Sequence, residues 1–472
     1  VQGVVDRLGQ VSPKVLITTD AYVYKGTRYS LQNKIEGIVD QIPTLEHVLV
    51  APQQGHRASF GQCMEETLNK APHRPLTFER VPFDHPLYIM YSSGTTGTPK
   101  CMVHGHGGTL LQHLKEHQLH CDMKDQDRVL YYTTTGWMMW NWLVSALGTG
   151  ATVCLYDGNP TYPDHVQQFR FVAQEKITHF GTSAKYIESL NKASVSVKDM
   201  FDLSSLRVML STGSPLYPDS FTYVYDKIKG NVQLSSISGG TDILSCFLLG
   251  NPLLPVYSGQ LQCAGLGMDV KIYDDEGISL ERGKGELVCT TPFPSKPVCF
   301  WNDEKGELYE KTYFNRFPNI WCHGDYIEKM VSGGYVIHGR SDAILNPGGV
   351  RIGTAEIYRQ LEKIESILES VVVGQEWQQD TRIVLFVKLK PGVNLDDTLC
   401  HIIKTTIKEA TTARHVPAKI IAVDDIPKTM NGKITELAVT HIIHNRPVKN
   451  TDALMNPQSL LLFKDLEALR MP

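Results

Sequence analysis

The chain has 472 residues, of which 42% are hydrophobic and 20% are charged, and its formal net charge is −4. This length predicts two or three domains with enough apolar residues to form real cores. A weakly acidic chain gives no electrostatic reason to expect a nucleic acid or an anionic membrane surface as a partner, and no apolar run approaches the roughly 18–20 residues of a membrane span.

The cysteines indicate the redox compartment of the protein, and the first residue bears on what precedes it in the chain. Ten cysteines stand singly along the chain, without a C-x-x-C pair, so neither a zinc site nor a thioredoxin-like site has support. A chain of this size does not need disulfides, and we expect reduced thiols and a cytosolic location. Because Val1 is not a methionine and precedes element-like sequence, we expect a further segment upstream.

The first 340 residues predict strands that alternate with helices. Short apolar runs of strand length occur at 15–17, 48–50, 88–91, 129–132, 151–156 and 206–211. Segments such as 109–120 and 165–175 lie between some of these runs and can form helices. This alternation is typical of an α/β fold with mainly parallel sheets.

From about residue 266 the pattern changes to short strands joined by tight turns. Strand-like runs occur at 270–273, 285–289 and 335–337, and Asp275-Glu276-Gly277 is typical of a turn. We therefore expect a small β subdomain in this part of the chain.

A compact α+β unit is expected after Gly339-Arg340-Ser341-Asp342. Thr354 fits the N-cap of a helix whose apolar face carries Ile357, Leu361, Ile364 and Leu368. Strands are expected at 371–373, 383–389 and 419–423, a second helix across 399–407, and a last helix after Asn456-Pro457.

The segment 91–100, Tyr-Ser-Ser-Gly-Thr-Thr-Gly-Thr-Pro-Lys, has the composition of a phosphate-binding loop. Gly94 and Gly97 permit sharp turns with bare N–H groups, and Lys100 adds a positive charge. Further hydrogen-bond donors are the hydroxyls of Ser92, Ser93, Thr95 and Thr96. The spacing is not that of a Walker A loop, and a Ser/Thr-rich surface turn is the alternative interpretation.

Further motifs follow in the order found in the adenylate-forming superfamily of acyl-coenzyme A synthetases, which this sequence resembles over almost its whole length. Besides the loop at 91–100, the matching segments are 211–215 (STGSP), 239–242 (GGTD), 322–325 (CHGD), 339–342 (GRSD), 348–351 (GGVR) and 427–433 (PKTMNGK). The resemblance implies a large N-terminal domain, here residues 1–340 and incomplete at its N-terminus, built of parallel-sheet subdomains and the small β subdomain. It also implies a mobile α+β C-terminal domain, here residues 341–472.

The superfamily joins a carboxylic acid to coenzyme A through an acyl adenylate, with release of AMP and diphosphate. The ATP-binding residues implied by the resemblance are the loop residues above with Gly213, Ser214, Pro215, Gly239, Gly240, Thr241, Asp242, Asp325, Arg340 and Arg351. Asp242 stands where the family usually has a glutamate, so a carboxylate for Mg²⁺ is kept but is one methylene shorter. Asp325 suits the ribose diol.

The resemblance assigns catalytic roles to two residues of the tail. Lys433 is implied to bridge the carboxylate and the α-phosphate, with a solvated surface lysine as the alternative. Asp342 is implied to be the hinge about which the tail turns between the two half-reactions. Gly348 and Gly349 suit the close approach of a pantetheine arm, and Lys408, or Arg351, could meet the nucleotide end of coenzyme A.

The acyl pocket is expected at Gly136-Trp137-Met138-Met139-Trp140-Asn141-Trp142. Trp137 and Met138 would supply its walls, and Asn141 could donate a hydrogen bond to a keto oxygen, although an ordinary core would contain the same residues. Gly239 stands where acetate- and propionate-activating relatives have a tryptophan, and we expect it to open room for a longer acid.

Segments 133–142, 237–243 and 345–351 closely resemble the branch of the superfamily that activates acetoacetate. The expected substrates are therefore acetoacetate, ATP and coenzyme A, with Mg²⁺ as cofactor and no protein partner evident. Two alternatives stay open. One is a synthetase for another short or medium-chain carboxylic acid, and the other is an inactive nucleotide-binding fragment.

Overall fold

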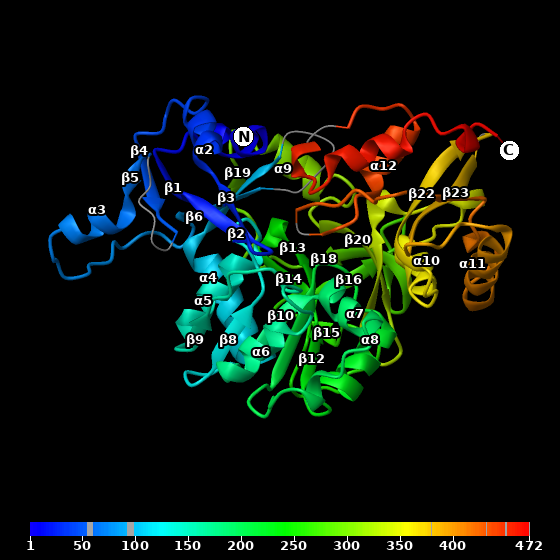
Figure 1. Cartoon of the computed structure of the whole chain (residues 1–472), viewed down its shortest axis with the longest axis horizontal. Coiled ribbons are helices and arrows are strands. Elements are labelled where there is room, and N and C mark those ends of the chain that lie inside the picture. The colour runs from blue at the N-terminus through cyan, green and yellow to red at the C-terminus, as the bar shows by residue number, and fades with distance from the viewer. Residues whose placement is uncertain (54–59, 92–98, 379, 431, 449–450, 472) are drawn as a thin grey trace.

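A five-stranded parallel sheet lies at the centre of the larger part of the molecule (Figure 1). The computed structural model describes the chain except residues 54–59, 92–98, 379, 431, 449–450 and 472. The sheet has the order β12-β11-β10-β8-β9 and is formed by Arg128–Tyr131 (β8), Thr152–Cys154 (β9), His179–Ser183 (β10), Val208–Thr212 (β11) and Gln233–Ser236 (β12). All its neighbouring strands are parallel, which confirms the expected α/β architecture.

Three helices contribute to the core beside this sheet. They are Gln167–Gln174 (α6), Ala184–Lys192 (α7) and Pro218–Tyr223 (α8). Phe169 of α6 and Phe180 of β10 are fully buried in one apolar cluster, with ring centroids 5.3 Å apart. This aromatic contact packs α6 against the sheet.

The N-terminal residues form a smaller parallel sheet of the order β1-β4-β5. Its strands are Val15–Thr19 (β1), His47–Ala51 (β4) and Gln62–Cys63 (β5), and the hairpin of Ala21–Tyr24 (β2) and Thr27–Ser30 (β3) follows β1. The helices are Gln2–Leu8 (α1), Gln32–Val39 (α2) and Met64–Lys70 (α3). Figure 1 shows these elements in blue at the upper left.

Two strands of a short antiparallel sheet and the helix after them lie between the two parallel sheets in the chain, and a further helix follows β8. Pro86–Tyr91 (β6), Cys101–Gly105 (β7) and Cys299–Phe300 (β19) form the sheet, and the expected phosphate loop joins β6 to β7. The helices are His106–Lys115 (α4) and Met139–Ser145 (α5). The helix expected at 109–120 starts earlier, and its last turn, Glu116–His120, is π-helical.

Antiparallel strands replace the parallel pattern after β12, in agreement with the expected β subdomain. Ser238–Gly240 (β13), Ser245–Leu249 (β14) and Cys263–Ala264 (β15) form one sheet. A second has the order β17-β16-β18-β20-β21, from Val270–Tyr273 (β16), Ser279–Leu280 (β17), Gly283–Cys289 (β18), Trp321–Lys329 (β20) and Tyr335–Arg340 (β21). The helix Glu307–Tyr313 (α9) precedes β20.

The tail after Arg340 has its own α+β core. The strands Ile367–Trp377 (β22), Asp380–Leu389 (β23) and Lys419–Ala422 (β24) form a sheet that is accompanied by the helices Thr354–Leu361 (α10), Asp397–Ala410 (α11) and Glu436–Ile443 (α12). Three apolar clusters in the described part of the tail contain buried residues from 345 to 469 and none from the larger part.

Two helix predictions for the tail are wrong in detail. Gly353, not Thr354, is the N-cap of α10, because its N–H donates to the Glu356 carboxylate at 3.0 Å and Thr354 is already helical. The helix ends at Leu361, and Leu368 lies in β22. The last expected helix is replaced by two short 3₁₀ segments, Pro457–Phe463 and Glu467–Leu469, in which Phe463 is fixed by packing on Phe386.

Polar contacts join the tail to the larger part. Lys284 of β18 donates to Glu356 of α10 at 2.6 Å, and Arg351 donates to the fully buried Glu286 at 2.7 Å. Within the residues that the structure describes, no helix combines the length and apolarity needed to cross a membrane.

Candidate active site

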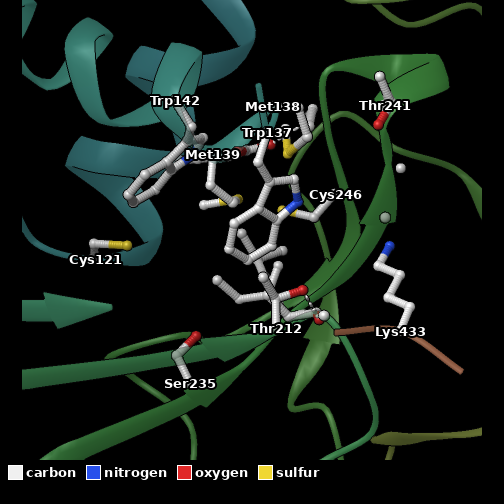
Figure 2. A pocket seen from close by; sticks show the side chains of 17 residues that line it. Cys121, Trp137, Met138, Met139, Trp142, Thr212, Ser235, Thr241, Cys246 and Lys433 are labelled. Atoms are coloured by element: carbon white, nitrogen blue, oxygen red, sulfur yellow. Dashed lines mark hydrogen bonds between the residues drawn. The ribbon is translucent and has the colours of Figure 1, made fainter. Parts of the chain in front are cut away.

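A pocket opens beside the carboxyl ends of β11 and β12, where ligands commonly bind in parallel α/β sheets. The first turn of α5 and the residues before it supply aromatic and methionine walls, the β13–β14 hairpin closes one side, and Lys433 reaches in from the tail (Figure 2). The lining includes Trp137, Met138, Met139, Trp142, Thr212, Gly213, Gly239, Gly240 and Thr241. Residues from both parts of the chain therefore meet at one cavity.

Lys433 is presented by a tight loop. The N–H of Thr429 donates to the Lys433 carbonyl at 2.8 Å, and the Lys433 N–H donates to Thr429 Oγ1 at 3.1 Å. Gly432 has φ of +76°, a conformation that favours glycine. Desolvation by the surrounding protein, together with the nearby Arg340 guanidinium, lowers the pKa of Lys433, while Asp325 and Asp242 oppose this shift.

Adjacent strands bring Asp325 and Arg340 together. Asp325 of β20 pairs in register with Arg340 of β21, and Arg340 Nη1 donates to Asp325 Oδ1 at 2.9 Å. The same nitrogen donates to the His323 carbonyl at 3.1 Å, and Arg340 Nε lies 3.9 Å from Asp342 Oδ1. The guanidinium is thus fixed beside the hinge candidate by a buried carboxylate, and half of its side chain stays exposed.

Asp242 lies in a second charged group. Tyr313 donates to its Oδ1 at 2.7 Å, and Lys100 Nζ lies 3.9 Å from the same oxygen. Burial raises the pKa of Asp242, but the Lys100 charge and further partners lower it more, so that it lies below its ordinary value. Burial raises the pKa of the Tyr313 hydroxyl, which remains a neutral donor.

The donor set at Asp242 fits a metal that is held chiefly by a nucleotide. The part of the chain that the structure describes contains no cluster of three or more His, Cys, Asp or Glu side chains suited to a metal. One carboxylate is nevertheless typical of Mg²⁺, which usually keeps several waters and binds substrate phosphates. The pairing with Lys100 places Asp242 next to the end of the expected phosphate loop.

The other predicted residues fall into three groups. Ser214 and Pro215 continue the turn after Gly213 at the end of β11. The predicted residues Ser92, Ser93, Gly94, Thr95, Thr96 and Gly97 lie outside the described residues. Among the residues whose side chains the structure describes, the pocket lining does not include Asn141, Gly348, Arg351 or Lys408, and Asn141 is buried in α5.

Arg351 has another role in this arrangement. Its guanidinium donates to Asp275 at 2.6 Å and to Glu286 at 2.7 Å, and it lies 4.6 Å from the centre of the Tyr326 ring. These contacts hold the segment that follows the hinge candidate against the β subdomain.

The structure gives a different reason for Gly239 than added room. A Cβ at this position would lie 2.2 Å from the Ser245 carbonyl oxygen and 2.3 Å from the Cys246 Cα. The glycine lines the pocket, but its missing side chain points to the backbone of β14. It therefore allows β13 and β14 to approach closely, and it does not by itself enlarge the cavity.

A buried polar network in the wall of the pocket was not predicted. Glu116 is fully buried, and its carboxylate accepts hydrogen bonds from Trp142 Nε1 at 2.9 Å, from Gln112 Nε2 at 3.0 Å and from the Ser245 hydroxyl. The available signal was the spacing of polar residues at 112, 113, 116, 117 and 120, which puts them on one face of a helix.

The chain is similar to AMP-binding enzymes over most of its length. The family described as "AMP-binding enzyme" matches residues 2–296, and "AMP-binding enzyme C-terminal domain" matches residues 359–433. The acetoacetyl-coenzyme A synthetase of Rhizobium meliloti is 54% identical over 99% of this chain and 73% of its own length, and the acetoacetyl-CoA synthetase of Gallus gallus is 44% identical over 100% and 72%.

Two solved structures extend this comparison. The acetoacetyl-CoA synthetase from Streptomyces lividans superposes with a TM-score of 0.94 at 43% identity, covering 100% of this chain and 73% of that one. The anthranilate CoA ligase AuaEII, solved with anthranoyl-AMP, gives a TM-score of 0.75 at 22% identity over 90% of this chain and 77% of its own, which shows a shared fold.

Proposed function

Because this chain belongs to the acetoacetyl-CoA synthetase family of AMP-binding enzymes, we propose that it joins acetoacetate to coenzyme A with ATP as the second substrate. A carboxylate oxygen of acetoacetate attacks the α-phosphorus of ATP, and diphosphate leaves. The thiol of coenzyme A then attacks the carbonyl carbon of the acetoacetyl adenylate, and AMP leaves with the attacking oxygen. The single observation that carries this proposal is the convergence of Lys433 with the Gly239–Thr241 turn and the Trp137–Met138 wall at one pocket.

The first half-reaction joins two anions, so its barrier is largely electrostatic and positional. Lys433 supplies a positive charge at the pocket, where it can lie between the carboxylate and the α-phosphate. Arg340 adds a second cation nearby, and its planar fork suits phosphate oxygens. The position of each cation is fixed before substrate binds, the first by the 429–433 loop and the second by Asp325.

The nucleotide is proposed to bind along the strand ends that border the pocket. The buried carboxylate of Asp325 can accept hydrogen bonds from both hydroxyls of a ribose. The turn at Gly213–Pro215 can face the adenine. Asp242 would hold Mg²⁺, which when bound neutralises part of the triphosphate charge. Lys100 reaches the same carboxylate and would meet the phosphates from the side of the 91–100 loop.

The second half-reaction needs Lys433 to leave and coenzyme A to enter. We propose that residues 341–472 turn as a unit about Asp342, which is exposed in the short 3₁₀ turn Ser341–Ala343. That rotation would release Arg351 from Glu286 and bring Gly348, Gly349 and Lys408 toward the thiol substrate. We place the activity in the cytoplasm, because all ten cysteines are free thiols, the state that a reducing compartment maintains.

The proposal is tested by measuring diphosphate release across a panel of carboxylates, with and without coenzyme A. We expect acetoacetate to give the highest kcat/KM in the panel and coenzyme A to be required for multiple turnovers. Diphosphate release that is faster with acetate, or with a medium-chain acid, would contradict the choice of acetoacetate. No acid-dependent release from a folded protein would contradict the proposed reaction as a whole.

A further inference from the structure

The end of the pocket away from Lys433 is polar, although the pocket walls are largely aromatic and methionine side chains. Figure 2 shows Ser235 and Cys121 across the pocket from Lys433. Glu116 also lines the cavity, and it lies close enough to Cys121 to add to the rise that burial causes in the pKa of that thiol. An acid that places its carboxylate at Lys433 would extend its other end toward these groups.

Most strong hydrogen-bond donors around this end are already used by the protein. The Ser245 hydroxyl donates to Glu116 and accepts from Gln112 Nε2 at 2.9 Å. Trp142 Nε1 also donates to Glu116, and Thr212 Oγ1 donates to the Ile237 carbonyl at 2.9 Å. These groups give the pocket its shape and polarity, but their hydrogens are not available to a ligand.

Ser235 differs from them. Its side chain is almost fully buried, with 2% exposed, and its oxygen accepts the Gly250 N–H at 2.9 Å. Among the described residues, the hydroxyl hydrogen of Ser235 meets no acceptor. A hydroxyl can donate while its oxygen accepts, so a ligand oxygen at this end of the pocket would complete its hydrogen bonding.

We propose that Ser235 is a specificity-determining residue that donates a hydrogen bond to the 3-oxo oxygen of the acyl chain. This inference rests on the proposed function, because it assumes that the acid binds with its carboxylate at Lys433. An acid of the same length without the oxygen would leave the Ser235 hydroxyl, and the polar surface around it, desolvated and unpaired. A site that binds an oxygen in this way discriminates against the hydrocarbon analogue far better than an apolar site does.

The test compares acetoacetate with butanoate, which has the same carbon chain without the oxo group. The quantity measured is the ratio of the two kcat/KM values for acid-dependent diphosphate release, in the wild type and in Ser235→Ala. The matched control is Ser236→Ala. Ser236 is also buried and follows Ser235 on β12, so its side chain points to the other face of the sheet, and it does not line the pocket.

We expect Ser235→Ala to lower the ratio by about tenfold or more, through a loss of kcat/KM for acetoacetate, and Ser236→Ala to leave the ratio within about twofold of the wild type. General damage, including the unpaired Gly250 N–H, lowers both values alike and does not change the ratio. Ser235→Cys, which replaces the hydroxyl by a slightly larger thiol that is a weak donor, should give an intermediate ratio. It is measured in place of the alanine variant if that variant does not fold.

An unchanged ratio in folded Ser235→Ala, or in Ser235→Cys where only that variant folds, would overturn the inference and leave the proposed function intact. Equal wild-type use of the two acids would also overturn it, while the adenylation chemistry would stand. A wild-type protein that releases diphosphate with neither acid contradicts the proposed function, and this inference with it.

Discussion

Lys433 is the residue on which we propose that the first half-reaction depends most directly. We predict that Lys433→Ala lowers acetoacetate-dependent diphosphate release by about 10²–10³-fold, because the variant lacks the cation between two anions. ATP binding should change little, and thioester formation from preformed acetoacetyl adenylate should persist, since Lys433 is proposed to leave for that step.

A lysine of the same loop provides the control for this prediction. Lys428 donates to Glu369 at 2.6 Å within the tail and does not line the pocket. Lys428→Ala should therefore keep most of the diphosphate release. Equal losses in the two variants would mean that damage to the loop, and not the Lys433 charge, explains the effect.

Gly239 gives a second prediction at this scale. It replaces the expectation from the sequence that this glycine opens room for a longer acid. Because a Cβ would meet the backbone of β14, Gly239→Ala must push two paired strands apart. We predict a loss of stability of about 1–3 kcal/mol and equal losses of kcat/KM for acetoacetate and acetate, measured by urea unfolding and by diphosphate release.

The control for Gly239→Ala is Gly136→Ala, in the pocket segment, where a Cβ would meet only Thr134 Oγ1 at 3.9 Å. This variant should retain stability. If Gly239→Ala instead kept its stability and shifted preference toward acetate, the interpretation of Gly239 as a pocket-enlarging residue would be restored.

Motifs made some residues of the site predictable and left others hidden. Lys433, Arg340 and Asp325 occur in short ordered motifs, so their convergence could be expected from the resemblance alone. Glu116 could not be found in this way, because its partner Ser245 is 129 residues distant and meets it only through packing of the π-helical turn on β14. Ser235 has no motif either, and its importance depends on which hydrogens its neighbours have used.

At the scale of elements, the turn at Ser341–Ala343 is expected to control the exchange between the two half-reactions. We predict that Asp342→Pro retains acetoacetyl adenylate formation while coenzyme A transfer falls by about tenfold or more. Proline fixes φ near −65° and restricts the preceding residue, so rotation about this turn is hindered. The two steps are measured separately, as diphosphate release in a single turnover and as thioester formation from preformed adenylate.

Asp342→Ala is the matched control, because it removes the carboxylate near Arg340 without fixing the backbone. It should leave the ratio of the two rates close to that of the wild type. A proline variant in which both steps fall equally, or in which only adenylation falls, would contradict the hinge role.

The contact between α10 and β18 gives a prediction about pH. Burial raises the pKa of Glu356, but the nearby His415 imidazole, 3.5 Å away, and the Lys284 ammonium, which donates a hydrogen bond at 2.6 Å, outweigh it and hold the pKa well below its usual range. A lowered carboxylate pKa contributes stability that is fully present above the unfolded-state pKa, near 4.3, and is lost as the pH falls toward the folded-state value.

We therefore predict that Glu356→Gln lowers the free energy of unfolding at pH 7 and that its difference from the wild type narrows by about 1 kcal/mol at pH 3.5. The measurement is urea unfolding of both proteins at the two pH values. A difference that stays constant with pH would show that the charge of Glu356 does not stabilise this contact.

The elements themselves were predictable where the apolar pattern is strong and less so where tertiary contacts decide. Three strands of the central sheet, β8, β9 and β11, follow from their apolar runs. The other two, β10 and β12, were not predicted, because each contains only one large apolar residue. The ends of α10 and the form of residues 457–469 do not, because a backbone–carboxylate cap at Gly353 and the packing of Phe463 on Phe386 determine them. Both depend on side chains that meet only after folding.

At the scale of the whole molecule, the site is shared between two parts that have separate apolar cores. The contacts described between them are largely polar, such as Lys284 with Glu356 and Arg351 with Glu286. Polar interfaces of this kind between domains are compatible with relative motion. The arrangement therefore fits an enzyme that assembles its site with Lys433 in place for one step and rearranges for the next.

The central claim is that an oxygen of acetoacetate attacks the α-phosphorus of ATP, and an oxygen label tests it most directly. Acetoacetate labelled with oxygen-18 in its carboxylate is incubated with the protein, ATP and coenzyme A, and the products are analysed by mass spectrometry. The account predicts acetoacetyl-coenzyme A, AMP and unlabelled diphosphate in equal amounts, with one labelled oxygen in each AMP. Formation of ADP with labelled inorganic phosphate, or of AMP without label, would contradict it.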